Sequence, residues 1–187
     1  MVRLTLVIII IYTCLTVYHT NVAGATLKLI PVVTKADIEG SRYVNASAII
    51  RRQGSIQDFN MDILLHVLLP LDDIRMNIGY SVRTRNSESR IYNKTIDFCS
   101  LLERPSIDRF GSLLIDDLRH HGIVPNRCPV QPKLIVFRNV TLTRVKLPGF
   151  LPETSFGFSV ICFKGSKYEH VFRSYWYGRL RKVMIRK

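Results

Sequence analysis

Arg75-Met76-Asn77-Ile78-Gly79-Tyr80-Ser81-Val82 alternates large apolar residues with polar or small ones at every second position. This period of two is typical of a β-strand with one buried face and one exposed face. The segment Phe156-Gly157-Phe158-Ser159-Val160-Ile161-Cys162-Phe163 has the same alternation with bulkier residues, and we interpret it as a core strand. Half-buried strands are therefore expected to dominate the fold.

Further strands are predicted on either side of these two segments. The candidates are residues 27–34, 42–51, 59–69, 134–142 and 168–176. In the fourth candidate one parity is apolar and is predicted to face the core: Leu134, Val136, Val140 and Leu142. Residues 59–69 are apolar on both faces and contain Asp62 and His66, so periodicity allows either a buried strand or a helix there.

One segment has the helical period. Between residues 106 and 120 the apolar residues form a single stripe: Ile107, Phe110, Leu113, Leu114 and Leu118. Ser106 is a suitable N-cap and Gly122 a suitable stop. Short strands at nearly regular spacing, without βαβ alternation, predict an all-β, immunoglobulin-like antiparallel β-sandwich of seven to eight strands. This one short helix is expected between the sixth and seventh strands.

The first 25 residues have the features of a secretory signal peptide. Arg3 supplies a positive charge, residues 4–17 are almost wholly apolar, and Ala23-Gly24-Ala25 provides small residues for cleavage. The apolar run is shorter than the ~20 residues that span a bilayer. We expect cleavage after Ala25, with Ala23 as the alternative site and an uncleaved membrane anchor as the competing interpretation. The prediction is a secreted, extracellular protein that does not span a membrane, with one domain over residues 26–187.

The chain is strongly basic. It has 27 Lys and Arg residues against 14 Asp and Glu residues, a formal net charge of +13. Such a charge favours acidic partners, but because the basic residues are scattered, a solvated surface is the favoured explanation. In the secretory pathway three N-x-S/T triplets become candidates for glycosylation, at Asn45, Asn93 and Asn139.

The segment Tyr175-Trp176-Tyr177 precedes the densest group of basic residues. Aromatic and cationic residues in alternation can bind nucleic acid, but secretion argues against that partner. Contact with anionic head groups or acidic glycans is an alternative. The favoured explanation is a terminal strand whose charges protect an exposed sheet edge from aggregation.

Cysteine pairing follows from the secretory prediction. Cys14 leaves with the signal peptide, while Cys99, Cys128 and Cys162 remain, so three pairings are possible and each leaves one thiol over. A bridge between Cys99 and Cys128 would close a loop of about 30 residues, worth ~3–4 kcal/mol. Cys162 lies in a predicted core strand, where a free thiol behaves as a small hydrophobe. Because Cys-x-x-Cys and His-x-x-x-His spacings do not occur, no metal site and no cofactor are predicted.

Three elements carry a family resemblance: Asn93-Lys94-Thr95-Ile96-Asp97-Phe98-Cys99, Asn126-Arg127-Cys128-Pro129, and Leu151-Pro152-Glu153-Thr154-Ser155-Phe156. They resemble motifs of an insect family of secreted proteins that share a domain of unknown function and include the chemosensory type-B proteins. The likeness extends over roughly residues 60–182. Thr154 stands where the family has glycine, and Cys162 is not part of the family pattern.

The resemblance also implies a relation to the lipid-recognition superfamily that contains the ganglioside activator and the endotoxin co-receptor. It implies two antiparallel sheets that enclose an apolar cavity, and a bridge between Cys99 and Cys128. Large, stiff aromatic side chains suit such a cavity, and the candidates by parity and position are Phe137, Phe156, Phe158, Phe172 and Trp176. An ordinary filled core would have the same pattern, so the sequence leaves both open.

Catalytic motifs are weak. His120 and His121 follow Asp116 and Asp117, but adjacent histidines point to different sides of a helix, so a solvated helix end is favoured. Gly-x-Ser-x-Gly and phosphate-binding glycine motifs do not occur. We therefore predict no catalytic residues and no enzyme, and a secreted hydrolase is only the third hypothesis.

The first functional hypothesis is a secreted carrier of an apolar small molecule, such as a lipid or a pheromone-like hydrocarbon, that presents it to a cell-surface receptor. The second is an extracellular protein-interaction module with a filled core and no ligand. Nucleic acid is not an expected partner. A cavity between the sheets distinguishes the first hypothesis from the second.

Overall fold

The computed structural model describes residues 26–52, 54, 59–84, 87–142 and 153–185 of the 187-residue chain. The chain divides into two compact units, one of residues 29–181 and one of residues 1–28 with 182–187. Residues 26–28 and 182–185 are the described part of the smaller unit, and they are strand residues. The predicted signal peptide lies outside the described residues, as do Leu151 and Pro152 of the third family element.

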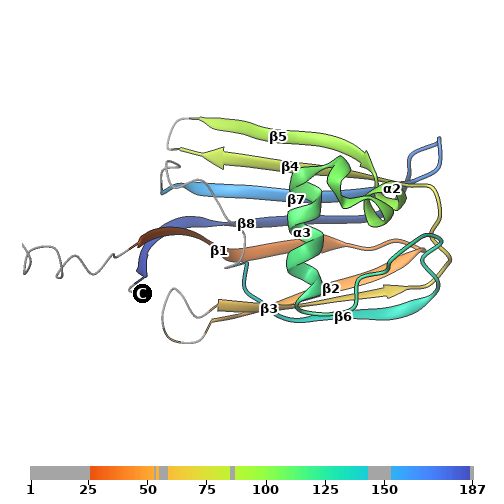
Figure 1. Ribbon diagram of the computed structural model, residues 1–187, viewed down its shortest axis with the longest axis horizontal. Coiled ribbons are helices and arrows are strands. Elements are labelled where there is room, and N and C mark those ends of the chain that lie inside the picture. The colour runs from red at the N-terminus through yellow and green to blue at the C-terminus, as the bar shows by residue number, and fades with distance from the viewer. Residues whose placement is uncertain (1–25, 53, 55–58, 85–86, 143–152, 186–187) are drawn as a thin grey trace, which may run out of the picture. The chain divides into compact units, whose positions relative to one another are not determined.

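Eight strands in the described ranges form two antiparallel sheets, which confirms the all-β sandwich (Figure 1). The larger sheet has the strand order β1-β8-β7-β4-β5, and the smaller has the order β2-β3-β6. The strands are β1 (Thr26–Glu39), β2 (Val44–Arg52), β3 (Phe59–Val67), β4 (Ile74–Arg83), β5 (Glu88–Asp97), β6 (Lys133–Val140), β7 (Ser155–Lys164) and β8 (Glu169–Ile185). Residues 59–69, left open by periodicity, thus form a strand over most of their length.

The two strands with the clearest alternation lie side by side. β4 pairs with β7 so that Met76 lies opposite Cys162 and Ile78 opposite Val160. Met76 and Ile78 are buried, as the alternation predicts. Because side chains alternate along a strand, the small and polar residues between them point to the other face of the sheet.

The predicted inward parity is wrong for the start of β6. Ile135 and Phe137 are buried, whereas Leu134 is 59% exposed. Asn139 has a left-handed backbone conformation (φ 55°), which interrupts the regular alternation, and Val140 beyond it is buried as predicted.

The helical insertion differs from the prediction in three ways. It lies between β5 and β6, the fifth and sixth strands, and it contains two α-helices, α2 (Phe98–Glu103) and α3 (Arg109–Arg119), with the short 3₁₀ helix η1 (Pro105–Ile107) between them. The N-cap of α3 is Asp108, whose carboxylate accepts the Gly111 N–H at 2.7 Å, and not Ser106. No helix in the described ranges has the length and apolar character needed to cross a bilayer.

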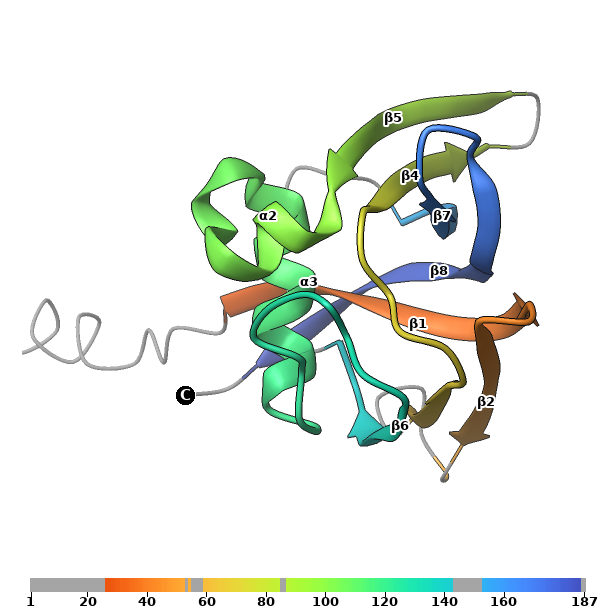
Figure 2. The same cartoon turned by 90° about the vertical axis from the view of Figure 1, so that its right-hand side faces the viewer.

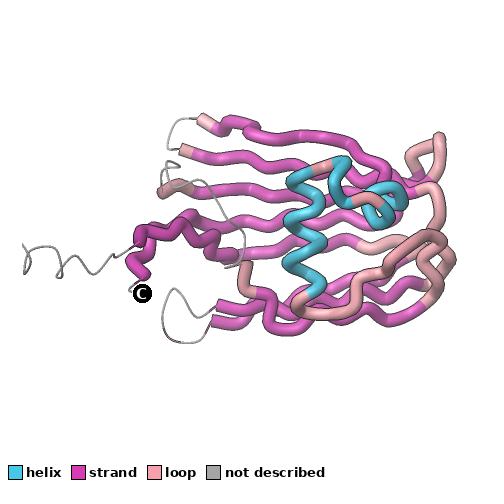
Figure 3. The backbone as a smooth tube through the Cα atoms, in the orientation of Figure 1, coloured by secondary structure: helices cyan, strands magenta, loops and turns pink. Residues whose placement is uncertain are grey.

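Helix α3 connects an edge strand of one sheet to an edge strand of the other (Figures 1 and 2). At its start, Asp108 accepts hydrogen bonds from the Tyr92 hydroxyl (2.8 Å) and Lys94 Nζ (3.0 Å) on β5. Beyond its end, the His121 carbonyl accepts the Arg138 N–H of β6 at 3.0 Å. The helix therefore closes the side of the sandwich between β5 and β6, and Figure 3 shows it lying across the strands.

A disulfide fixes this insertion to the chain. Cys99 at the start of α2 is bonded to Cys128 in the loop after α3, while Cys162 is a free thiol. Of the three pairings that the sequence allows, this is the one that the family resemblance implies. The bond encloses α2, η1 and α3 in one covalent loop.

Strand β8 lies between β1 and β7, so the prediction of a terminal strand at an exposed sheet edge is wrong. β8 is not an edge strand because β1, from the other end of the described chain, pairs with its free side. The residue pattern within β8 carries no information on that pairing. The aromatic and basic residues of β8 therefore need another explanation than protection of an edge.

Gly178 on β8 is packed closely against Val32 of β1 and Phe156 of β7. A Cβ atom added there would lie 2.2 Å from the Val32 carbonyl oxygen and 2.7 Å from the Phe156 ring. We expect Gly178→Ala to lower the free energy of unfolding by about 1–3 kcal/mol, because backbone must move to relieve the overlap. Gly157→Ala is the control, since its Cβ would meet only the movable Ser81 hydroxyl at 3.0 Å. Equal urea denaturation curves for the two variants would contradict this expectation.

Candidate ligand cavity

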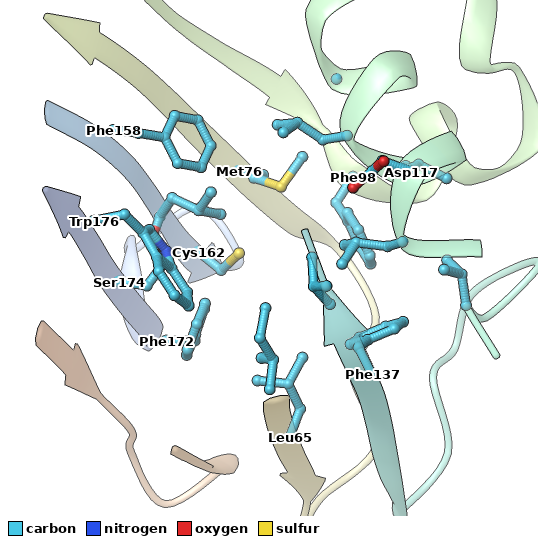
Figure 4. A pocket seen from close by; sticks show the side chains of 18 of the residues that line it. Leu65, Met76, Phe98, Asp117, Phe137, Phe158, Cys162, Phe172, Ser174 and Trp176 are labelled. Atoms are coloured by element: carbon cyan, nitrogen blue, oxygen red, sulfur yellow. The ribbon is translucent and has the colours of Figure 1, made fainter. Parts of the chain in front are cut away.

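A cavity of about 290 Å³ lies within the sandwich, lined by side chains of both sheets and of α3. Phe158 and Cys162 of the larger sheet face Leu65 and Phe137 of the smaller one across it (Figure 4). Phe110, Leu114 and Leu118 of α3 complete the lining between the sheets. The volume is close to the lower end of the ~300–1,000 Å³ range of small-molecule sites.

All five aromatic residues selected from the sequence line this cavity: Phe137, Phe156, Phe158, Phe172 and Trp176. Phe137 comes from β6, Phe156 and Phe158 from β7, and the other two from β8. Their contact with a ligand stays a prediction. The pattern identified which aromatic residues face inward, whereas the space between them is a property of the folded structure.

The polar groups of β8 next to the cavity bond to each other and to the backbone. The Trp176 Nε1–H donates to Ser174 Oγ at 3.0 Å, and Ser174 Oγ donates to the Val160 carbonyl at 3.4 Å. Ser174 and Trp176 are both buried. Because these groups satisfy one another, the surface that the cavity offers is almost entirely apolar.

Cys162 places its sulfur toward the cavity from β7 (Figure 4). Burial raises the pKa of its thiol to about 12, so the group is a neutral thiol at physiological pH. A neutral thiol that faces the cavity adds to the apolar lining and is a poor nucleophile.

An aromatic cluster at one end of the cavity was missed by sequence reasoning. The Tyr80 ring lies 6.1 Å from Phe156 and 6.4 Å from Phe110, and Phe110 lies 6.0 Å from Phe158. The parity of Tyr80 on β4 could have identified it. Phe110 could have been found only by knowing that α3 covers the open side of the sandwich.

Asp117 is a buried acidic residue of α3 that also lines the cavity. His120 and His121 follow it, and one ring nitrogen of each is engaged elsewhere: His120 Nδ1 lies 2.7 Å from the Asp116 carbonyl oxygen and His121 Nδ1 lies 3.1 Å from the Arg138 carbonyl oxygen. Within the described ranges, no group of three His, Cys, Asp or Glu side chains is placed to hold a metal ion.

The three sequon asparagines lie on strands and are exposed. Asn45 is on β2, Asn93 on β5 and Asn139 on β6. Exposure is compatible with a glycan at each position, and their modification stays a prediction. None of the three lines the cavity between the sheets.

One family model matches part of the chain. Residues 74–158 match the family model described as a protein of unknown function, DUF1091. The match runs from β4 to the start of β7 and includes the helical insertion and both disulfide cysteines. No curated protein matches the chain. The chain is thus similar to a family whose function is itself unknown, so function has to be argued from the cavity.

Proposed function

We propose that the protein is a non-enzymatic carrier that binds an apolar small molecule, a lipid or a hydrocarbon chain, in the cavity between its sheets. The observation that supports this most directly is the apolar lining of a cavity of about 290 Å³. Protein interiors otherwise contain few voids larger than a water molecule. An interaction module with a filled core would not need such a space.

The chemistry of the lining favours a ligand with little polarity. Trp176 and Ser174 use their polar atoms on each other, and the Cys162 thiol is neutral. A ligand hydroxyl or carboxylate buried against the apolar side chains of the strands, away from Asp117 on α3, would lose its bonds to water without gaining new ones, at a cost of roughly 2–7 kcal/mol for a hydroxyl. A hydrocarbon chain has no hydrogen bonds to water to lose on entry, and its apolar surface leaves water.

A ligand in the cavity would also stabilise the core. Empty space in a protein interior costs roughly 24 cal/mol per Å³ in measured cavities, so a large void is a substantial loss of packing. A ligand that fills the space restores contacts to the surrounding aromatic rings. The resemblance to chemosensory and lipid-recognition proteins supports the same function, as does the predicted export of the chain to the extracellular space.

The carrier function can be tested directly on protein secreted from insect cells. Native mass spectrometry and organic extraction are expected to find a co-purifying apolar compound. For protein freed of that compound, the apolar fluorescent probe N-phenyl-1-naphthylamine is expected to bind, and Leu65→Trp is expected to weaken binding at least about tenfold by filling the cavity.

Leu64→Trp is the matched control. Leu64 is the next residue on β3, and it does not line the cavity, whereas Leu65 does. Both variants add the same side chain to the same strand, so only the face differs. Equal probe affinity in the two variants, or secreted protein that neither carries nor takes up apolar compounds, would refute the carrier function and favour the interaction module.

A further inference from the structure

The outward face of the larger sheet carries a second, wide depression, the trough, with a volume of about 1020 Å³. Its floor lies over the neighbouring inner strands β4 and β7, and its margins lie on β5 and β8. Most of the floor consists of small or polar residues, and Ile161 is its large apolar residue: Asn77, Gly79, Ser81, Ser155, Gly157, Ser159 and Ile161. The trough and the cavity lie on opposite faces of the same sheet.

The floor is low because glycine and serine face each other across β4 and β7. Gly79 pairs with Ser159, and Ser81 pairs with Gly157. A Cβ atom added at Gly79 would lie 2.5 Å from Ser159 Oγ, so the serine hydroxyl occupies the space above its partner glycine. From Asn77 to Arg83 this floor extends over roughly 20 Å at the usual rise of a strand.

The margin on β8 is aromatic. Tyr175 and Tyr177 line the trough, while Trp176 between them lines the cavity on the other face. Tyr177 is 40% exposed. The sequence pattern assigns both tyrosines to a terminal strand at an exposed sheet edge. Because β8 is an inner strand, their rings form one wall of a surface groove instead.

The charge of the trough is positive. Arg83, Arg90 and Arg179 line it, and Glu88 is its one acidic lining residue. Glu88 lies 2.6 Å from Arg83 and accepts a hydrogen bond from Ser81. Among the described residues, neither Arg90 nor Arg179 is within ion-pair distance of an acidic group, and both are exposed, although the charge of Arg90 helps to lower the pKa of Glu88. Two cations are therefore available to an external anion.

The geometry points to a binding site for an extended acidic polysaccharide in this trough. A polysaccharide chain fits a long groove with a flat polar floor, its rings can pack on Tyr175 and Tyr177, and its sulfate or carboxylate groups can pair with Arg90 and Arg179. A membrane surface is flat and would not reach a recessed floor. This site is on another face than the cavity and does not depend on the carrier function.

The test uses the full secreted protein after enzymatic removal of N-linked glycans, because Asn93 lies at the β5 margin of the trough. The probe is a heparin octasaccharide, measured by titration calorimetry near physiological salt. Arg90→Ala with Arg179→Ala is expected to lower affinity about tenfold, since two exposed charge pairs are lost. Glu88→Gln is expected to raise affinity, because it removes the acid and releases Arg83.

The matched control is Arg127→Ala with Lys133→Ala, which removes the same charge from exposed positions outside the trough. It is expected to change affinity less than about twofold. Ser159→Trp, which fills the trough without changing charge, is expected to abolish binding, whereas Ser47→Trp on β2 is not. Equal losses in the two double variants, or unchanged binding by Ser159→Trp, would overturn the site. Equal binding of a charge-matched DNA oligonucleotide or of phosphatidylserine vesicles would overturn the choice of a polysaccharide.

Discussion

Replacing both Cys99 and Cys128 with serine is expected to lower the free energy of unfolding by about 3–4 kcal/mol. The bond joins residues separated by 29 positions. Without the disulfide, the unfolded chain gains the conformational freedom of that loop. The chain-entropy account of disulfides then predicts that the folded state is less stable relative to the unfolded state. Urea denaturation of the double variant and of the native protein measures the difference.

Cys162→Ala provides the control for loss of a cysteine. Cys162 is a free thiol in the cavity lining, so its replacement removes only a small apolar group and is expected to cost less than about 1.5 kcal/mol. The double replacement is preferable to a single one, because a single change would leave Cys99 or Cys128 free to react. Equal stabilities of the double variant and the native protein would contradict the entropic role of the bond.

The disulfide also bears on the proposed function. It closes the loop that contains α3, and α3 supplies Phe110, Leu114 and Leu118 to the cavity. A helix that is less firmly held would open this side of the sandwich more often. The double serine variant is therefore expected to release a bound apolar probe faster than the native protein does, even under conditions where both remain folded.

The sequence predicted the strands well where one face is strictly apolar. Met76 and Ile78 on β4 alternate with polar or small residues, and the structure buries both. The same argument failed on β6, because it assumed unbroken alternation. The left-handed backbone at Asn139 cannot be recognised from an apolar pattern, and so Leu134 was assigned to the buried face although Ile135 takes that place.

The helical insertion was predictable only in part. The stripe along α3 is long enough to show the helical period, whereas α2 spans six residues and is too short to show one. Ser106 and Asp108 are both good N-cap residues. The structure selects Asp108 because its carboxylate also meets Tyr92 and Lys94 from β5, and a tertiary contact of that kind is invisible in local sequence.

The cavity itself could not be predicted from residues alone. Phe158 and Phe172 would have the same parity in a filled core and in a lined cavity. What distinguishes the two is the separation of the sheets, which depends on α3 standing between β5 and β6. The trough depends likewise on the pairing of Gly79 with Ser159 across two strands that are distant in sequence.

Asp108→Ala is expected to lower the free energy of unfolding by about 2–4 kcal/mol at neutral pH. The carboxylate is 5% exposed, caps α3 through the Gly111 N–H, and accepts hydrogen bonds from Tyr92 and Lys94. Without it, the helix loses its cap and the connection to β5. Lys94 is half exposed, so water screens its share of the interaction.

The pH dependence of this loss identifies the charged carboxylate as its cause. Burial alone would raise the pKa of Asp108, but the hydrogen bonds from Gly111, Lys94 and Tyr92 outweigh burial, so the pKa lies below its usual value. A carboxyl group with a lowered pKa in the folded state stabilises the protein fully above its unfolded pKa of about 3.9, and this contribution is lost as the pH falls through the folded pKa. The difference between the native protein and Asp108→Ala should therefore be constant above about pH 5 and shrink in acid.

Asp116→Ala separates this effect from a general effect of acidic residues on α3. Asp116 is exposed and pairs with Arg119 on the same helix, so its loss is expected to cost no more than about 0.5 kcal/mol. Other carboxyl groups with lowered pKa values, such as Asp62, titrate alike in both variants and cancel in the comparison. A stability difference for Asp108→Ala that stays unchanged down to pH 2 would show that the Asp108 side chain acts by packing alone. The charge of the Asp108 carboxylate would then not contribute to holding α3 against β5.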